Sequence, residues 1–208
     1  MKNYVELLRI EQWLKNFIIF IPLFAYGEIN TEDIVELILV FVFFSFVVSS
    51  TYVLNDILDL ESDLNHPTKN KRPLASEKIP IKNAQFILII FFVIGKIGLF
   101  YLDSTVLLYS FVYVFGTTSY SFLFKYKKYF DILIISFLFI IRLLIGSNAV
   151  AIDLSIPLFL FVFFTSLGIV SAKKYSILNN REIINTRIKK FLNENYELSE
   201  LEFIFKSS

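Results

Sequence analysis

Three aspartates in one short polar stretch are the residues of this chain best suited to chemistry. Asp56, Asp59 and Asp63 are spaced i, i+3 and i+7, which places them on one face of a helix. Three carboxylates that close together repel one another unless a cation lies among them. Mg²⁺ prefers such hard oxygen ligands and takes one or two carboxylates together with phosphate oxygens. The spacing therefore predicts a magnesium site that holds a phosphorylated substrate.

A basic segment follows the acidic one and could bind the same phosphates. Lys69, Lys71 and Arg72 lie a few residues downstream, and arginine is suited to bidentate phosphate contacts. An alternative interpretation is a solvated acidic helix end beside a basic stretch that contacts anionic lipid. The helical phase of the acids, and their separation from the bases, favour the substrate site. His66, the only histidine, is interpreted as a turn residue before Pro67.

The elements that position these residues must be membrane helices. Of the 208 residues, 56% are hydrophobic and only 19% are charged, which leaves too little polar surface for a soluble domain. A membrane span needs about 20 mostly apolar residues, and lipid-exposed backbone has to be helical. The sequence therefore predicts an all-α polytopic transmembrane helical bundle. The six expected spans are Leu14–Ile29, Ile34–Leu54, Ala84–Leu102, Thr105–Phe124, Tyr129–Ile152 and Leu154–Ala172.

The distribution of charge predicts the orientation of these spans. All but two of the 20 basic residues lie before or at the start of the first span, or after the second, fourth and sixth spans. The opposite loops carry only acids. The positive-inside rule then places the N-terminus and the active-site loops on the cytoplasmic side of the inner (plasma) membrane. The predicted cytoplasmic segments are the Asp-rich loop, 55–82, and the segment 173–200.

Several motifs resemble those of one family. The pattern Asn55-Asp56-x-x-Asp59-x-x-x-Asp63 resembles the first aspartate-rich motif of the UbiA-type membrane prenyltransferase superfamily. The opening Arg9–Asn16 and the run His66–Ser76 are similar to its decaprenyl-phosphate phosphoribosyltransferase branch. Further matching positions are Tyr120, Ser121, Lys125, Asp131, Arg142 and Gly146.

The resemblance implies a Mg²⁺-dependent transfer of 5-phosphoribose from phosphoribosyl pyrophosphate to a polyprenyl phosphate lipid, for cell-envelope polysaccharide precursors. Asp56, Asp59 and Asp63 would then be the catalytic metal ligands. The implied phosphate-binding residues are Lys15, Lys69, Arg72, Lys125, Arg142 and Lys173, and the implied supporting residues are Asn55, Tyr120 and Asp131. Departing diphosphate develops negative charge that a metal and fixed cations stabilise. The attacking phosphate is already anionic, so no strong general base is required.

Two basic residues lie inside spans, where a charge usually faces a cavity or a partner. Arg142 fits the family pattern and is expected to face the substrate cavity. Lys96 has no counterpart in that pattern and is assigned no function; it could snorkel toward the membrane surface or pair with an acid. Asp131, near the start of the fifth span, is interpreted either as a substrate contact or as the partner of Lys127 or Lys128.

The chain departs from the family pattern at two places. Ile177 stands where the family carries an acid after its sixth span. The family has about nine spans, so residues 1–208 are interpreted as a single UbiA-like domain that is incomplete at its C-terminus, with 173–200 leading to a missing seventh span. The alternatives are an aromatic (4-hydroxybenzoate-type) polyprenyltransferase that uses a prenyl diphosphate, or an inactive fragment or half of a split enzyme. A homo-oligomer or a complementing C-terminal fragment stays open as a partner; nucleic acid is not expected.

Overall fold

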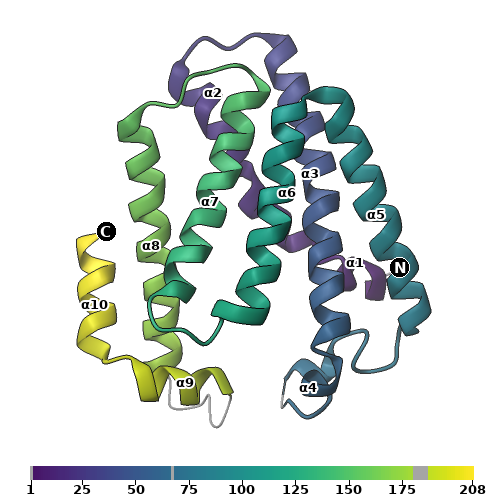
Figure 1. The fold of residues 1–208 in the computed structure, drawn as a ribbon, viewed down its shortest axis with the longest axis vertical. Coiled ribbons are helices and arrows are strands. Elements are labelled where there is room, and N and C mark those ends of the chain that lie inside the picture. The colour runs from purple at the N-terminus through teal and green to yellow at the C-terminus, as the bar shows by residue number, and fades with distance from the viewer. Residues whose placement is uncertain (1, 67, 180–186) are drawn as a thin grey trace. The chain divides into compact units, whose positions relative to one another are not determined.

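The computed structural model describes residues 2–66, 68–179 and 187–208, and every regular element within these ranges is a helix. This confirms the all-α prediction. In chain order (Figure 1), the elements are α1 (Lys2–Leu7), η1 (Ile10–Phe20), α2 (Ile21–Tyr26), α3 (Thr31–Leu58), α4 (Leu60–Leu64), η2 (Lys69–Lys71), α5 (Ile81–Leu102), α6 (Ser104–Ser119), η3 (Tyr120–Phe124), α7 (Phe130–Ala149), α8 (Ile156–Asn179), α9 (Arg187–Asn195) and α10 (Leu198–Ser207).

In the described part of the chain, five helices are long and apolar enough to cross a membrane. They are α3, α5, α6 continued by η3, α7 and α8, and they correspond to the second to sixth predicted spans. The last of them continues seven residues past its predicted end at Ala172, to Asn179, so Lys173 and Lys174 lie on a helix. The distal part of the predicted segment 173–200 forms α9 and the start of α10, while 180–186 lie outside the described residues.

The first predicted span is helical but is not one continuous α-helix. It is divided into the 3₁₀ helix η1 and the short α2, which carries Pro22 in its first turn and ends at Gly27, where φ is 87°. Proline has no N–H to continue a preceding helix and is favoured at the start of a new one. A 3₁₀ helix rises about 2.0 Å per residue against 1.5 Å in an α-helix, so η1 and α2 together reach about 31 Å. That length matches the roughly 30 Å of bilayer hydrocarbon.

The contacts within the chain divide it into two compact units. The first unit consists of Met1–Phe115 and Arg142–Asp153, and the second of Gly116–Ile141 and Leu154–Ser208. In the first unit α3 and α5 pack side by side (Figure 1). A glycine allows this approach, because a Cβ at Gly95 would lie only 2.7 Å from the carbonyl oxygen of Phe43.

The 3₁₀ helix η1 is held against α3 by pairs of polar side chains. The Trp13 indole donates to Ser49 Oγ at 2.9 Å, and the Asn16 amide donates to Ser45 Oγ at the same distance. Ser49 in turn donates to the carbonyl oxygen of Leu8 at 2.8 Å. These bonds fix the register between η1 and the half of α3 that ends in the aspartates.

In the second unit, α10 packs along α8 (Figure 1), and α9 also contacts α8. The buried side chains of this unit's core come from α7, α8, α9 and α10 and from the turn before α10; they are Ile132, Val170, Phe191, Leu192, Tyr196 and Leu201. A capping box between Glu197 and Glu200 begins α10. The helices α9 and α10 therefore fold back onto α8.

Candidate functional site

The three aspartates lie where α3 passes into α4. Asp56 is in the last turn of α3, Asp59 joins the two helices, and Asp63 is in α4. The Asp59 amide donates to the Asn55 carbonyl and the Asp63 amide to the Asp59 carbonyl, both at 2.8 Å. Because these i to i−4 bonds run across the junction, the helical phase predicted for the aspartates is largely kept.

Two of the aspartates are buried and share one guanidinium group. Arg72 Nη1 lies 3.0 Å from Asp56 Oδ1 and 2.5 Å from Asp63 Oδ2. Lys69 Nζ lies 3.4 Å from Asp63 Oδ1. The exposed fractions of the Asp56 and Asp63 side chains are only 4% and 2%. The structure thus brings together four of the predicted site residues, with a basic side chain on each carboxylate.

A fifth member of this cluster, Arg9, is not among the predicted site residues. Its Nη2 lies 2.5 Å from Asp56 Oδ1, and its guanidinium lies 4.9 Å from the centre of the Tyr52 ring. The backbone of Arg9 is left-handed, with φ 49° and ψ 51°, which costs a non-glycine residue about 1–2 kcal/mol. Arg9 opens the N-terminal motif Arg9–Asn16, and that position was the signal that could have identified it.

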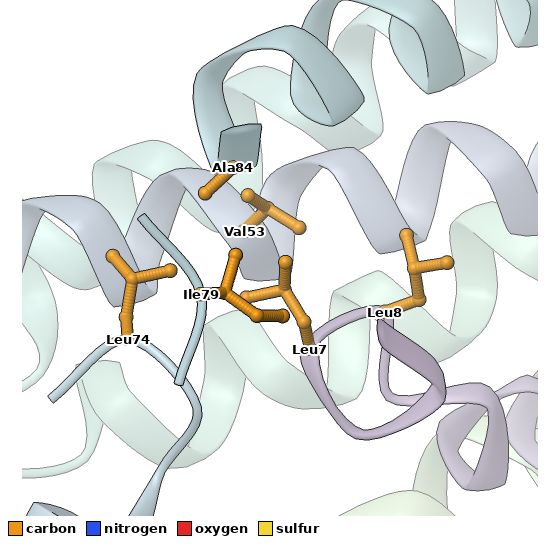
Figure 2. Close-up of a cluster of buried hydrophobic side chains, with 6 residues drawn as sticks. All are labelled: Leu7, Leu8, Val53, Leu74, Ile79 and Ala84. Carbon is orange, nitrogen blue, oxygen red and sulfur yellow. The ribbon is translucent and has the colours of Figure 1, made fainter. Parts of the chain in front are cut away.

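An apolar cluster fixes the three segments that carry these charges. Figure 2 shows Leu7, Leu8, Val53, Leu74, Ile79 and Ala84 gathered at one place. Leu7 and Leu8 directly precede Arg9, Val53 is one helical turn before Asp56, and Leu74 follows Arg72 by two residues. Burying a leucine or valine contributes about 1.5–3 kcal/mol. The position of the ionic cluster is therefore set by hydrophobic packing beside it.

The chemistry of this cluster fits a divalent cation in part. Among the residues that the structure describes, no three acidic, histidine or cysteine side chains gather at one point, so the predicted three-aspartate cluster stays a prediction. However, Asp56 and Asp63 contact one and the same nitrogen, and carboxylate oxygens are what Mg²⁺ prefers. Asp63 Oδ1 is buried and accepts no hydrogen bond, although Lys69 lies within ion-pair distance. An oxygen in that state is a suitable ligand for a cation.

The turn after α4 contains His66, and its ring stabilises the backbone. The amides of Thr68 and Lys69 both approach His66 Nδ1 at 3.3 Å, as expected for a turn residue; Pro67 lies outside the described residues. Burial, aided by the charge of Lys69, lowers the pKa of His66 below its usual value. The neutral ring that results can accept these amide hydrogens.

Three other predicted site residues belong to the first unit, namely Lys15, Asn55 and Arg142. Lys15 is exposed on η1, and Asn55 is half-buried next to Asp56. Arg142 is 4% exposed; its Nε donates to Asn16 Oδ1 at 2.9 Å and its Nη2 to the Tyr113 hydroxyl at 2.8 Å. A role of Arg142 in binding phosphate stays a prediction. These bonds also connect α7 to η1.

Lys96, which was assigned no function, is buried within α5. Its ammonium donates to Ser110 Oγ at 2.7 Å and lies 3.6 Å from the centre of the Phe111 ring. Both contacts come from α6 and satisfy the charge inside the apolar part of the unit. The structure therefore gives Lys96 a packing role between α5 and α6.

The second unit holds Tyr120, Lys125, Asp131 and Lys173. Tyr120 and Lys125 are half-buried at the end of the span that η3 completes, and Lys173 is exposed on α8. Asp131 is fully buried and contacts the Lys174 ammonium. The expected pairing of Asp131 with Lys127 or Lys128 was wrong, because Lys174 is brought to it by the packing of α8. Lys128 is 2.9 Å from Glu200 instead.

The C-terminal helices add two residues to this polar cluster that the sequence did not single out. The Tyr196 hydroxyl donates to Asp131 Oδ1 at 2.8 Å, and the Tyr129 amide donates to that hydroxyl at 2.5 Å. Burial, followed by the hydrogen bond to Asp131, raises the pKa of Tyr196. The hydrogen bond with Lys128 lowers the pKa of Glu200 and raises that of Lys128. These contacts tie α10 and the turn before it to the start of α7.

Known proteins share both the sequence and the fold of this chain. Residues 16–179 match the model of the UbiA prenyltransferase family. A decaprenyl-phosphate phosphoribosyltransferase from Mycobacterium tuberculosis is 32% identical over 98% of this chain and 69% of its own length. One from Corynebacterium glutamicum is 32% identical over 97% of the chain and 62% of its length. A UbiA homolog from Archaeoglobus fulgidus, solved with DMAPP and Mg²⁺, has a TM-score of 0.74 at 17% identity, covering 99% of this chain and 72% of that one. The chain is an integral membrane protein and belongs to the UbiA prenyltransferase family.

Proposed function

We propose that this chain transfers a 5-phosphoribosyl group from phosphoribosyl pyrophosphate to a polyprenyl phosphate, with Mg²⁺ as cofactor. The observation that carries the proposal is the ionic cluster in which Arg9, Lys69 and Arg72 surround the two buried carboxylates Asp56 and Asp63. The relatives named decaprenyl-phosphate phosphoribosyltransferase support the choice of both substrates.

The charges of this cluster suit a metal-bound diphosphate. Three basic side chains stand against two carboxylates, so a bound divalent cation would leave a clear excess of positive charge. A diphosphate leaving group carries several negative charges and would balance that excess. A prenyl or sugar substrate without a phosphate group would leave the cluster uncompensated, and burying it would be costly.

The residues of the ionic cluster would have distinct roles in the transfer reaction. Asp56, Asp63 and, by the family pattern, Asp59 would hold the ion, which when bound would neutralise charge on the departing diphosphate. Arg72 and Lys69 would bind and orient the diphosphate oxygens. An oxygen of the lipid phosphate forms a bond to C1 of the ribose while the bond from C1 to the diphosphate oxygen breaks, and the diphosphate leaves with the electron pair. The acceptor is anionic, so no side chain has to remove a proton.

The remaining assignments belong to the same proposal. Lys15, Lys125, Arg142 and Lys173 are candidates for further phosphate contacts, and Asn55, Tyr120 and Asp131 for supporting roles. The distribution of basic residues supports a cytoplasmic position for the N-terminus and for the loop 55–82. The donor would then be taken up from the cytoplasm and the acceptor from the membrane.

The proposal is tested with the full chain in lipid nanodiscs. Labelled phosphoribosyl pyrophosphate and decaprenyl phosphate are supplied with Mg²⁺, and a parallel sample receives geranyl diphosphate and 4-hydroxybenzoate. We expect label in the lipid of the first sample and no prenylated 4-hydroxybenzoate in the second. Label transfer should be lost after EDTA and in Asp56→Asn. Glu61→Gln, an exposed carboxylate of α4, is the matched control and should keep full activity. Turnover in the second sample alone would make the aromatic prenyltransferase the correct assignment.

A further inference from the structure

The carboxylate of Asp56 has no place for a metal ion at its Oδ1 as the cluster stands. Arg9 Nη2 and Arg72 Nη1 both contact this one oxygen, at 2.5 Å and 3.0 Å. A carboxylate oxygen offers about two lone-pair directions, and two charge-assisted hydrogen bonds use both of them. A cation that binds Oδ1 must therefore displace at least one guanidinium group.

Asp63 differs from Asp56 in this respect. Its Oδ2 is taken by Arg72, but its buried Oδ1 accepts no hydrogen bond and has only the Lys69 ammonium nearby, at 3.4 Å. This oxygen is therefore an available ligand for a cation. Asp63 Oδ1 would hold an ion without losing a hydrogen bond, whereas Asp56 Oδ1 and Asp63 Oδ2 already accept hydrogen bonds from arginine.

We propose that Arg9 and Arg72 are built-in counter-cations of Asp56, and that a divalent ion displaces them and so makes them available to the diphosphate. This inference rests on the proposed function and adds Arg9 to it as a residue that binds the diphosphate. The ion and the diphosphate then bind cooperatively, because the same movement opens the carboxylates to the ion and turns guanidinium groups toward the phosphates. Arginine is suited to both partners, since its planar donors match carboxylate and phosphate alike.

The surroundings of Arg9 allow such an exchange. Its side chain is 23% exposed, so it has room to move toward a substrate. The Tyr52 ring, 4.9 Å away, offers a cation–π contact in place of part of the lost ion pair. The backbone is held by Leu7 and Leu8 in the apolar cluster (Figure 2). The guanidinium can therefore change partners while its base stays fixed.

Exchange makes an unusual prediction about affinity. If Arg9 competes with the ion, Arg9→Gln will bind the ion more tightly when no diphosphate is present. With the ion saturating, the same variant will bind pyrophosphate more weakly, because it has lost a donor to the phosphates. A residue that only supports the fold would weaken both equilibria. Lys78 is exposed in the same loop and has no part in the proposed site, so Lys78→Gln measures the effect of removing a loop charge that is screened by solvent and salt.

The experiment measures Mn²⁺ binding to the full chain in nanodiscs through the electron paramagnetic resonance signal of free Mn²⁺. We expect the Kd for Mn²⁺ to fall about fivefold or more in Arg9→Gln, within the usual range of coupling between two sites, and to change less than about twofold in Lys78→Gln. Arg9→Lys keeps the charge but loses the planar donors, so it should lie between wild type and Arg9→Gln. Pyrophosphate affinity, measured by calorimetry with saturating Mn²⁺, should fall in Arg9→Gln.

A second measurement uses the wild-type chain and does not depend on a folded variant. Phenylglyoxal modifies accessible arginines, and mass spectrometry of peptides reports each site. Mn²⁺ should accelerate modification of Arg9 and Arg72, and pyrophosphate added afterwards should protect them. Unchanged rates together with an unchanged or weaker Mn²⁺ affinity in Arg9→Gln would overturn the inference while leaving the proposed function intact. If wild type binds no Mn²⁺, or binds it no better than Asp56→Asn does, the metal assignment is wrong and the inference falls with it.

Discussion

Replacing Gly146 by alanine tests how closely η1 must approach α7. A Cβ at Gly146 would lie 1.9 Å from the carbonyl oxygen of Ile19 and 2.7 Å from its carbonyl carbon. These are backbone atoms, so η1 has to move outward by about 1 Å in an interior that is close-packed. Asn16, one 3₁₀ turn before Ile19, would lose its bonds with Ser45 and Arg142, which now measure 2.9 Å.

The cost of Gly146→Ala follows from these terms. Overpacking costs about 1–3 kcal/mol, the two lost hydrogen bonds about 1 kcal/mol each, and the better helix propensity of alanine returns about 1 kcal/mol. The net loss is about 3 kcal/mol, which corresponds to a melting temperature lower by about 6–12 °C in a chain of this length.

The assay is thermal unfolding of the detergent-solubilised full chain at a fixed scan rate, because membrane proteins often unfold irreversibly. Gly116→Ala is the matched control: the nearest atom to its new Cβ is a methyl of Leu138 at 3.0 Å, and a flexible side chain can yield. We expect this variant to stay within about 1 kcal/mol of wild type. Equal melting temperatures for the two alanine variants would refute the packing argument.

Three further predictions concern the supports of the two polar clusters. Leu74→Ala removes a side chain that is 4% exposed and should lower the free energy of unfolding by about 2–4 kcal/mol. Because Leu74 supports the segment of Arg72, the variant should raise the KM for phosphoribosyl pyrophosphate more than it lowers kcat, and an unchanged KM would contradict this. Tyr196→Phe removes the hydroxyl that bonds Asp131 and should destabilise the chain by about 1–3 kcal/mol in the same unfolding assay. Because Lys128 lowers the pKa of Glu200, folding keeps that carboxylate ionised: its contribution is present above the ordinary glutamate pKa of about 4.3 and lost as the pH falls through the lowered value. The protection factors of the α10 amides, which correct for the intrinsic pH dependence of exchange, should therefore fall on acidification in wild type, and Glu200→Gln should flatten this dependence.

The sequence predicts the long spans well because their signal is strong. In α3, α5, α7 and α8 apolar residues continue for about five helical turns, and the predicted and observed bounds differ by only a few residues except at the end of α8. The 3₁₀ helix could not be predicted in this way. Over eleven residues a period of 3.0 is hardly distinguishable from one of 3.6, and only Pro22 indicated that the first span was irregular.

The site was predictable where its members are close in sequence. Asp56, Asp63, Lys69 and Arg72 lie within one loop, so their meeting follows from local spacing. Arg9 is 47 residues from Asp56, and its contribution depends on how η1 packs against α3. The pairing of Asp131 with Lys174 is tertiary in the same sense. Charge pattern names the residues that a site could use, but only packing decides which of them meet.

The three-residue period of the 3₁₀ helix η1 limits which sequence changes this segment can accept. Residues 13, 16 and 19 follow one another at the 3₁₀ spacing, and Asn16 and Ile19 are fully buried, while Leu14 and Phe17 are largely exposed. Substitutions on the outward side should be tolerated by the surrounding lipid. A single inserted or deleted residue, in contrast, would rotate one half of the segment by about a third of a turn. Homologous chains should therefore differ in composition along η1 while conserving its length, and grafts of this segment succeed only when that length is preserved.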